Sequence, residues 1–170
     1  MPVPTIPDRS EPQTAAGYLA IMSRAIFQAG VSWKAIAARW DAYERLFDGF
    51  DPSVVAGYDD LDIERILSDG GVMRTYKKVA ATVDNAKTLL ALEREYGDFR
   101  NYLRSFASYD QLAADLKKRF KFLGDLSVYY FLFRAGERVP QFEDWEKTVA
   151  GDHPRMREMV ALARSQGYEG

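Results

Sequence analysis

The stretch "SYDQLAADLKKRFKFLGDLSVYYFLFRAG", residues 108–136, decides the fold class, because it predicts two helices joined by a tight turn at Gly124. Its first half places apolar side chains at helical spacing among charged ones. Its second half is strongly apolar from about Ser127 to Ala135, which indicates a helix buried in a core. Glycine in so short a connection is typical of a break between helices.

The rest of the chain repeats this helical period and carries almost no strand signal. Thr14 and Ser32 are predicted N-caps, and Asp51 followed by Pro52 is typical of a helix start. Further helices are predicted within 14–30, 32–49, 51–58, 59–71, 74–97 and, as a pair, 140–167. We therefore expect an all-α fold of about eight helices around one or two cores.

Composition indicates one domain. The chain has 170 residues, of which 47% are hydrophobic, enough for a sizeable core, and we expect a single helical domain over 14–170. The proline-rich residues 1–13 predict a flexible N-terminal arm, without the apolar segment of a signal peptide or membrane anchor. We expect a cytoplasmic monomer that needs no cofactor, and no metal, because cysteine is absent and His153 is the single histidine.

Three ordered motifs carry a family resemblance. They are "FQAGVSW" (27–33), "FDPSVVAGYDDLDIERILSDGGVMRTYKKVAATVDNAKTLL" (50–90) and "KRFKFLGDLSVYYFLFRAG" (118–136). From about Ala15 to Gly136 the chain resembles the 3-methyladenine DNA glycosylase I (Tag) family of the helix-hairpin-helix glycosylase superfamily. The resemblance implies a helix-hairpin-helix DNA glycosylase-like fold. It also implies an enzyme that acts on double-stranded DNA containing a damaged base. Such an enzyme must extrude a nucleotide from the stack, fill the hole and hold the backbone.

The first motif would supply the pocket and the wedge. The resemblance implies that Gly30 allows close approach to the duplex, that Val31 fills the vacated stack, and that Gln28 contacts a base edge. Trp33 offers an aromatic wall, on which stacking contributes about 1–3 kcal/mol per base. The alternative is a plain interhelix corner, in which Val31 and Trp33 are core residues and Gly30 ends a helix.

The hairpin would supply the phosphate clamp. Backbone N–H groups at a hairpin and at the following helix N-terminus favour a phosphate. The residues expected to bind the DNA backbone are Lys117, Lys118, Arg119, Lys121, Gly124 and Ser127, with a second patch of Arg74, Lys77 and Lys78. A net charge of −2 argues against binding by overall charge, so these clusters would have to act locally. Asp125 opposes the clamp, and solvated helix faces are the alternative.

The sequence departs from the family pattern at the residues that recognise the base and bind zinc. Family members carry a glutamate in the helix before "QAG" that helps to recognise the methylated base, and Ala25 occupies that position here. The family's zinc site of Cys and His residues cannot form without cysteine. We expect base selection to differ or to be lost.

A carboxylate elsewhere is the candidate general base. The wider superfamily has an aspartate at the start of the helix after the hairpin, and a spacing of twenty residues from Gly124 places it at Asp144. Tag sequences place their aspartate nearer to the hairpin, at a spacing that falls on Pro140 in this chain. Glu143, adjacent to Asp144, is a second candidate. Both acids also suit a helix N-terminus, which is the structural alternative. His153 is expected to be a surface cap residue.

Two functions remain open from the sequence. The first is a base-excision repair glycosylase that hydrolyses the N-glycosidic bond of an alkylated purine such as 3-methyladenine, and it predicts that Asp144→Asn abolishes base release. The second is a catalytically inactive DNA-binding protein of the same fold. A helical protein–protein module without a nucleic-acid partner is a more distant third, which salt-insensitive or absent DNA binding would favour.

Overall fold

The computed structural model describes residues 3–170. Within that range every regular secondary-structure element is a helix, as predicted. The two residues of the predicted arm that precede Val3 lie outside this range. The elements are α1 (Ala15–Gln28), α2 (Trp33–Leu46), the 3-10 turn η1 (Asp48–Phe50), α3 (Pro52–Val55), α4 (Asp60–Ser68), α5 (Tyr76–Tyr96), α6 (Phe99–Leu103), α7 (Tyr109–Arg119), α8 (Asp125–Arg134), α9 (Phe142–Glu146) and α10 (Pro154–Ser165). The sequence did not predict the short helix α6.

Side-chain caps begin the helices where the sequence places them. The Thr14 hydroxyl accepts from Gly17 N at 3.2 Å, and the Ser32 hydroxyl accepts from Ala35 N at 3.2 Å. Asp51 caps α3, which has proline in its first turn, and Asp59 forms a capping box at α4. These bonds satisfy amides that a helix start leaves unpaired.

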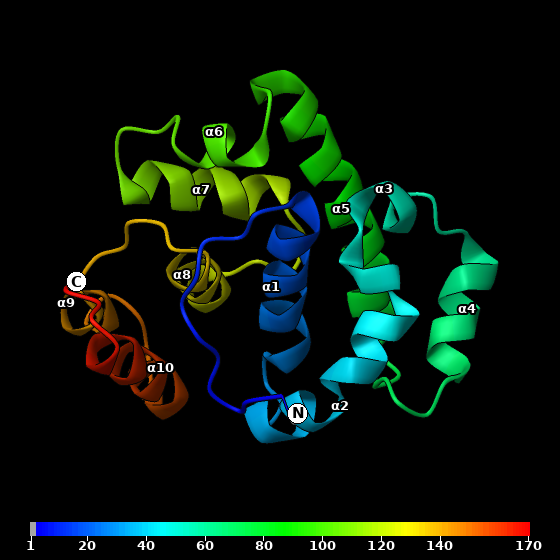
Figure 1. Cartoon of the computed structure of the whole chain (residues 1–170), viewed down its shortest axis with the longest axis horizontal. Helices are drawn as coiled ribbons and strands as arrows, with labels where there is room; N and C mark the ends of the chain where they lie inside the picture. The colour runs from blue at the N-terminus through cyan, green and yellow to red at the C-terminus, as the bar shows by residue number, and fades with distance from the viewer. Residues whose placement is uncertain (1–2) are drawn as a thin grey trace.

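Helix α1 runs through the centre of the molecule (Figure 1), and it contacts α2, α5 and α8. Ten of its fourteen residues are buried, which explains why its sequence is so apolar. Aromatic side chains fill the space around it: Phe27 packs edge-to-face on Tyr43, with ring centroids 4.8 Å apart, and Tyr18 packs on Phe99 at 5.2 Å. The core therefore positions both ends of α1.

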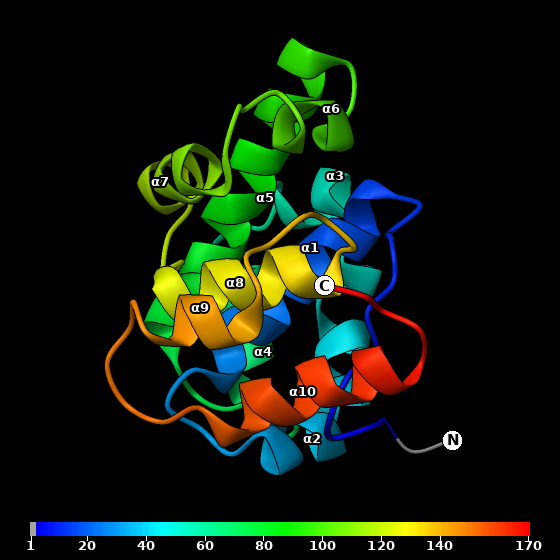
Figure 2. The ribbon, with the colours of Figure 1, turned by 90° about the vertical axis from the view of Figure 1, so that its left-hand side faces the viewer.

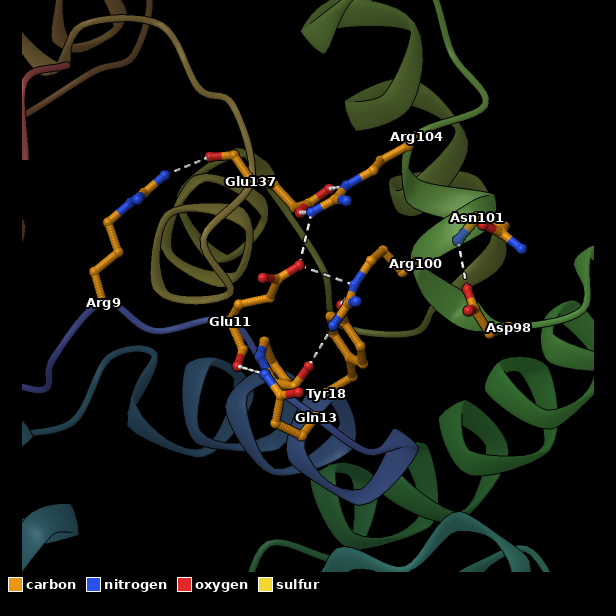
Figure 3. A network of polar contacts seen from close by, with 10 residues as sticks. Arg9, Glu11, Gln13, Tyr18, Asp98, Arg100, Asn101, Arg104 and Glu137 are labelled. Atoms are coloured by element: carbon orange, nitrogen blue, oxygen red, sulfur yellow. Dashed lines mark hydrogen bonds and ion pairs between the residues drawn. The ribbon is translucent and has the colours of Figure 1, made fainter.

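The N-terminal segment, which the sequence predicts to be a flexible arm, makes long-range contacts with the helices. Glu11 lies between two arginines of the α6 region (Figure 3), 3.0 Å from Arg100 Nε and 2.9 Å from Arg104 Nη2. Arg104 also pairs with the buried carboxylate of Glu137 at 3.0 Å, and Arg9 donates to the Glu137 carbonyl at 2.9 Å. These contacts connect residues 9–11 to the α6 region and to the segment after α8, and the flexibility of the arm stays a prediction.

The C-terminal helix returns toward the beginning of the chain. Figure 2 shows α10 crossing the face below α8 and α9 and lying near the α1–α2 end of the molecule. Met156, Met159 and Val160 are buried and belong to the common core. No helix of residues 3–170 is long and apolar enough to cross a membrane.

Candidate nucleic-acid interface and base pocket

The turn between α1 and α2 projects a short exposed loop. Gly30 has φ +75°, a left-handed conformation that strains any residue with a side chain. Ala29 and Gly30 are exposed, Val31 is half-buried, and Val31 N donates to Gln28 O at 3.0 Å. The corner thus exposes the backbone of Ala29 and Gly30, whereas Val31 packs partly against the core, as the interhelix-corner alternative expects.

Lys78 on α5 supports this turn from beneath. Its Nζ donates to Ala29 O at 3.0 Å and to Phe27 O at 3.4 Å, where the negative end of the α1 dipole favours a cation. Burial lowers the pKa of the Lys78 ammonium. Arg74 and Lys77, the other members of the second basic patch, are exposed and have no ion pair within residues 3–170. Lys78 therefore positions the turn, and the other two cations face solvent.

A cavity of about 590 Å³ opens beside the turn, within the size range of small-molecule sites. Its walls come from the end of α1, the turn, the start of α2, the first half of α8 and the start of α10. The lining residues are Ala25, Gln28, Ala29, Gly30, Val31, Ser32, Trp33, Leu126, Ser127, Tyr130, Asp152, His153, Pro154, Arg155 and Met156. All five residues predicted for pocket and wedge are therefore brought together.

Two aromatic rings form one wall of the cavity. Trp33 and Tyr130 meet edge-to-face, with ring centroids 5.3 Å apart and planes at 85°. Tyr130 is buried and its hydroxyl accepts from Arg134 Nη1 at 3.3 Å, whereas Trp33 stays half-buried. A half-buried indole in the cavity lining is the kind of side chain on which a planar base stacks.

Gln28 provides a polar group at a buried position. Its side chain is 4% exposed, and its Oε1 has no hydrogen-bond partner in the structure. Ala25, one turn earlier on α1, is 3% exposed and adds no polar atom. The deep part of the cavity therefore offers an amide and no carboxylate.

The opposite wall, residues 152–156, was missed by sequence reasoning. His153, expected to be a surface cap, precedes α10 without a capping bond and is half-buried at the cavity, where its Nε2 lies 2.8 Å from Ala150 O. Asp152 is the one carboxylate among the lining residues, and the hydrogen bond from Arg157 lowers its pKa. No local pattern signals this wall, because it forms only when α10 folds back onto the core.

The hairpin between α7 and α8 is built differently from the sequence prediction. The left-handed residue is Phe122, with φ +59°, whereas Gly124 has an extended backbone with φ −96°. A Cβ at Gly124 would meet no atom within 4 Å. Glycine is therefore not required by the turn; its contribution is to leave the start of α8 uncovered.

The start of α8 lies between the hairpin and the pocket. No side chain caps its first amides, so these N–H groups keep the partial positive charge of a helix N-terminus. Leu126 and Ser127, in the same turn, line the cavity, and Leu126 is 41% exposed. The first turn of α8 therefore does two things. Its free N–H groups suit a phosphate, and its side chains line a cavity large enough for a base.

Carboxylates neutralise much of the basic cluster. Lys117 pairs with Asp125 at 2.7 Å, Arg119 with Asp115 at 2.7 Å, and Lys121 with Asp84 at 2.6 Å. Lys118 is exposed and has no such pair in the part of the chain that the structure describes. The positive electrostatic potential at the hairpin is therefore weaker than the four basic residues within 117–121 would suggest.

The two candidate catalytic acids do not line this pocket. Asp144 borders a separate cavity of about 610 Å³ with Asp125 and Val128, residues of α8 other than those that line the first cavity. Glu143 binds Arg164 of α10 through both oxygens, at 2.6 and 2.9 Å. The structure thus gives Glu143 a structural partner and separates Asp144 from Gln28 and Trp33.

The donor set does not fit the zinc site of the resembled family. Over residues 3–170, no three His, Cys, Asp or Glu side chains gather as metal ligands. Thiolates and imidazoles are the usual ligands of structural zinc, and this chain has no cysteine.

Comparisons with known proteins agree with this geometry. Residues 15–139 match the family model described as methyladenine glycosylase. DNA-3-methyladenine glycosylase 1 of Escherichia coli (strain K12) is 31% identical over 130 residues, which cover 64% of this chain and 70% of that protein. DNA-3-methyladenine glycosylase of Haemophilus influenzae is 30% identical over the same shares. The structure of 3-methyladenine DNA glycosylase I (TAG) from Staphylococcus aureus superposes with a TM-score of 0.67 at 27% identity, over 84% of this chain and 87% of that one.

Proposed function

The chain belongs to the methyladenine glycosylase family, and on that premise we propose that it is a DNA-3-methyladenine glycosylase of base-excision repair. It hydrolyses the N-glycosidic bond that joins an alkylated purine to its deoxyribose. The single observation that carries this proposal is the position of α8, whose first turn presents free amides beside the hairpin while its Leu126, Ser127 and Tyr130 line the pocket.

Binding begins at the backbone of the duplex. The uncapped amides of α8 receive a phosphate, and Lys118 with Arg74 and Lys77 adds long-range attraction. The exposed turn at Gly30 then approaches the duplex, and Val31 occupies the space of the extruded nucleotide. Ser127, at the junction of the two regions, contacts either the backbone or the base.

The extruded base enters the cavity between Trp33 and the 152–156 wall. Alkylation at N3 places positive charge on the purine, which makes it a good leaving group. Water adds to C1′ of the sugar, the bond from C1′ to the base nitrogen breaks with its electron pair leaving on the base, and the water loses a proton. We assign to Asp152, the carboxylate of the cavity lining, the stabilisation of the positive charge that develops on the sugar, although Asp152 is exposed and also pairs with Arg157.

We further propose double-stranded DNA with a damaged base as the partner, a monomer as the acting species, and the cytoplasm as its location. We expect duplex DNA as the substrate because the role proposed for Val31, filling the space of an extruded nucleotide, arises only where bases are stacked in a duplex.

The test is release of 3-methyladenine from methylated duplex DNA by the purified chain. Wild type should release the base, and Trp33→Ala should release it more slowly because it lacks the stacking wall. Lys118→Glu should bind duplex more weakly and with a smaller salt dependence. The control Lys147→Glu, at an exposed lysine directly after α9, should change neither. Duplex binding without any base release would instead indicate the inactive DNA-binding protein.

A further inference from the structure

We infer that the start of α5 binds the strand of the duplex opposite the extruded nucleotide, through the side chains of Arg74, Tyr76 and Lys77. Each of the three donates to a phosphate oxygen of that complementary strand. The inference rests on the proposed function, because it needs a duplex on the same face of the molecule. It goes beyond that function because long-range attraction does not distinguish the two strands, whereas a direct contact does.

The three side chains at the start of α5 are free to bind a ligand. Arg74 and Lys77 are exposed, and Tyr76 is 57% exposed. Within residues 3–170 no ion pair or hydrogen bond engages any of these side chains. At the hairpin, by contrast, three of the basic residues within 117–121 are paired with carboxylates. The start of α5 therefore offers an anion positive charge that is not already neutralised.

The start of α5 borders the turn between α1 and α2, outside the cavity. Lys78, the residue after Lys77, donates to Ala29 O at 3.0 Å and to Phe27 O at 3.4 Å. The cavity beside the same turn is lined from α1, α2, α8 and residues 152–156, and none of the described residues of α5 lines it. The turn therefore has the cavity on one side and the start of α5 on another.

This arrangement assigns one strand to each side of the turn. The extruded nucleotide enters the cavity, so its strand follows the cavity side, where the free amides of α8 suit a phosphate. Val31 fills the space that this nucleotide leaves between the strands. The complementary strand then passes on the side of α5. Arginine, lysine and tyrosine side chains are among the usual donors to DNA phosphates, and this segment supplies one of each.

Helix α5 sets the separation between the two strand contacts. Asn85, further along this helix, holds Lys121 of the hairpin by hydrogen bonds of 3.1 and 2.8 Å. The rise of an α-helix places Lys77 and Asn85 about 12 Å apart along the axis of α5. The grooves of B-DNA are about 6–12 Å wide. One rigid helix can therefore hold a contact for each strand across a groove.

The experiment measures binding to a labelled duplex with a tetrahydrofuran abasic site, which leaves space for the wedge and has no base to release. Neutral methylphosphonate linkages replace phosphates either around the abasic site or, on the complementary strand, around the nucleotide opposite it. Fluorescence anisotropy compares wild type with Arg74→Gln/Lys77→Gln and with Tyr76→Phe. The matched control is Arg138→Gln/Lys147→Gln, at exposed positions without an ion pair in residues 3–170.

Arg74→Gln/Lys77→Gln should make the slope of log K against log salt shallower by about 1.8, the value for two lost phosphate contacts. The control should keep the wild-type slope. Neutral linkages on the complementary strand should weaken wild-type binding, and the loss should be at least about 2-fold smaller in the double variant, which has already lost the contact. Tyr76→Phe should show a coupling to the same strand. Neutral linkages around the abasic site should weaken wild type and variants equally.

Coupling of these variants to the abasic strand, or coupling to neither strand, would overturn the inference. So would a coupling to the complementary strand that Lys34→Gln, in the first turn of α2, shows in their place. Circular dichroism confirms that the variants are folded. Failure of the proposed function looks different: the coupling would be observed, but wild type would release no 3-methyladenine from methylated duplex. Release without the coupling would leave the function standing and remove the start of α5 from strand recognition.

Discussion

Asn85 on α5 holds both backbone groups of Lys121 in the hairpin, donating to its carbonyl oxygen at 3.1 Å and accepting from its N–H at 2.8 Å. Asn85 is 1% exposed, so the two bonds form away from water. They fix the chain just before Phe122, the residue that carries the left-handed turn. The long helix α5 therefore holds the hairpin in place on one side and, through Lys78, the α1–α2 turn on the other.

Asn85→Ala should destabilise the fold and weaken duplex binding together. Two buried hydrogen bonds are lost, and we expect about 1–3 kcal/mol lower free energy of unfolding in urea. DNA affinity should fall because the hairpin no longer presents α8 in one orientation. Asn101→Ala, which removes an exposed side chain on α6, serves as the control and should leave DNA affinity unchanged. An unaltered affinity in Asn85→Ala would contradict this account of the hairpin.

Asp125→Asn should strengthen duplex binding. The substitution frees Lys117 from its 2.7 Å ion pair and removes a negative charge from the first turn of α8, where a phosphate is proposed to bind. The gain should be largest at low salt and should shrink as salt screens the charges. Fluorescence anisotropy of a labelled duplex across a salt series measures it. Weaker binding by Asp125→Asn would place the phosphate elsewhere.

Asp152→Asn should slow base release, whereas Asp144→Asn should leave it close to the wild-type rate. Asp152 lines the base pocket, and Asp144 lines the other cavity. This expectation departs from the sequence-based hypothesis, in which Asp144 was the general base. Single-turnover release from methylated duplex compares the two variants directly. Loss of release in Asp144→Asn alone would restore the spacing argument and remove Asp152 from the chemistry.

Local features of the fold could be predicted from sequence, and long-range ones could not. Thr14 and Ser32 were recognisable caps because their partners lie three residues away. His153 was missed as a pocket residue because its neighbours come from α1 and α8, more than twenty residues earlier in the chain. The hairpin shows an intermediate case: the turn was predicted, but its positive φ falls on Phe122, since Asn85 and the core decide the local backbone.

Glu143→Gln should lower thermal stability at neutral pH, and this effect should shrink as the pH falls toward 2. The hydrogen bonds from Arg164 lower the pKa of the Glu143 carboxyl from 4.5 to about 2. A depressed folded-state pKa means that the contribution is complete above pH 4.5 and is lost as the pH falls toward 2. The effect should be small because this pair is largely exposed to water. Melting curves at neutral pH and near pH 2, with Glu64→Gln as an exposed control, measure it. A difference that is as large near pH 2 as at neutral pH would point to another cause.

Gln28→Leu should raise the stability of the fold. Gln28 Oε1 is buried without a partner, and an unsatisfied polar atom of this kind costs about 1–3 kcal/mol. Leucine has a similar size and needs no partner, so the melting temperature should rise by about 2–4 °C for each kcal/mol gained. Gln166→Leu, at an exposed position, should change stability by less than about 0.5 kcal/mol. A lower melting temperature for Gln28→Leu would mean that the amide stabilises the free protein. A higher one would show that the chain keeps this buried amide at the expense of stability.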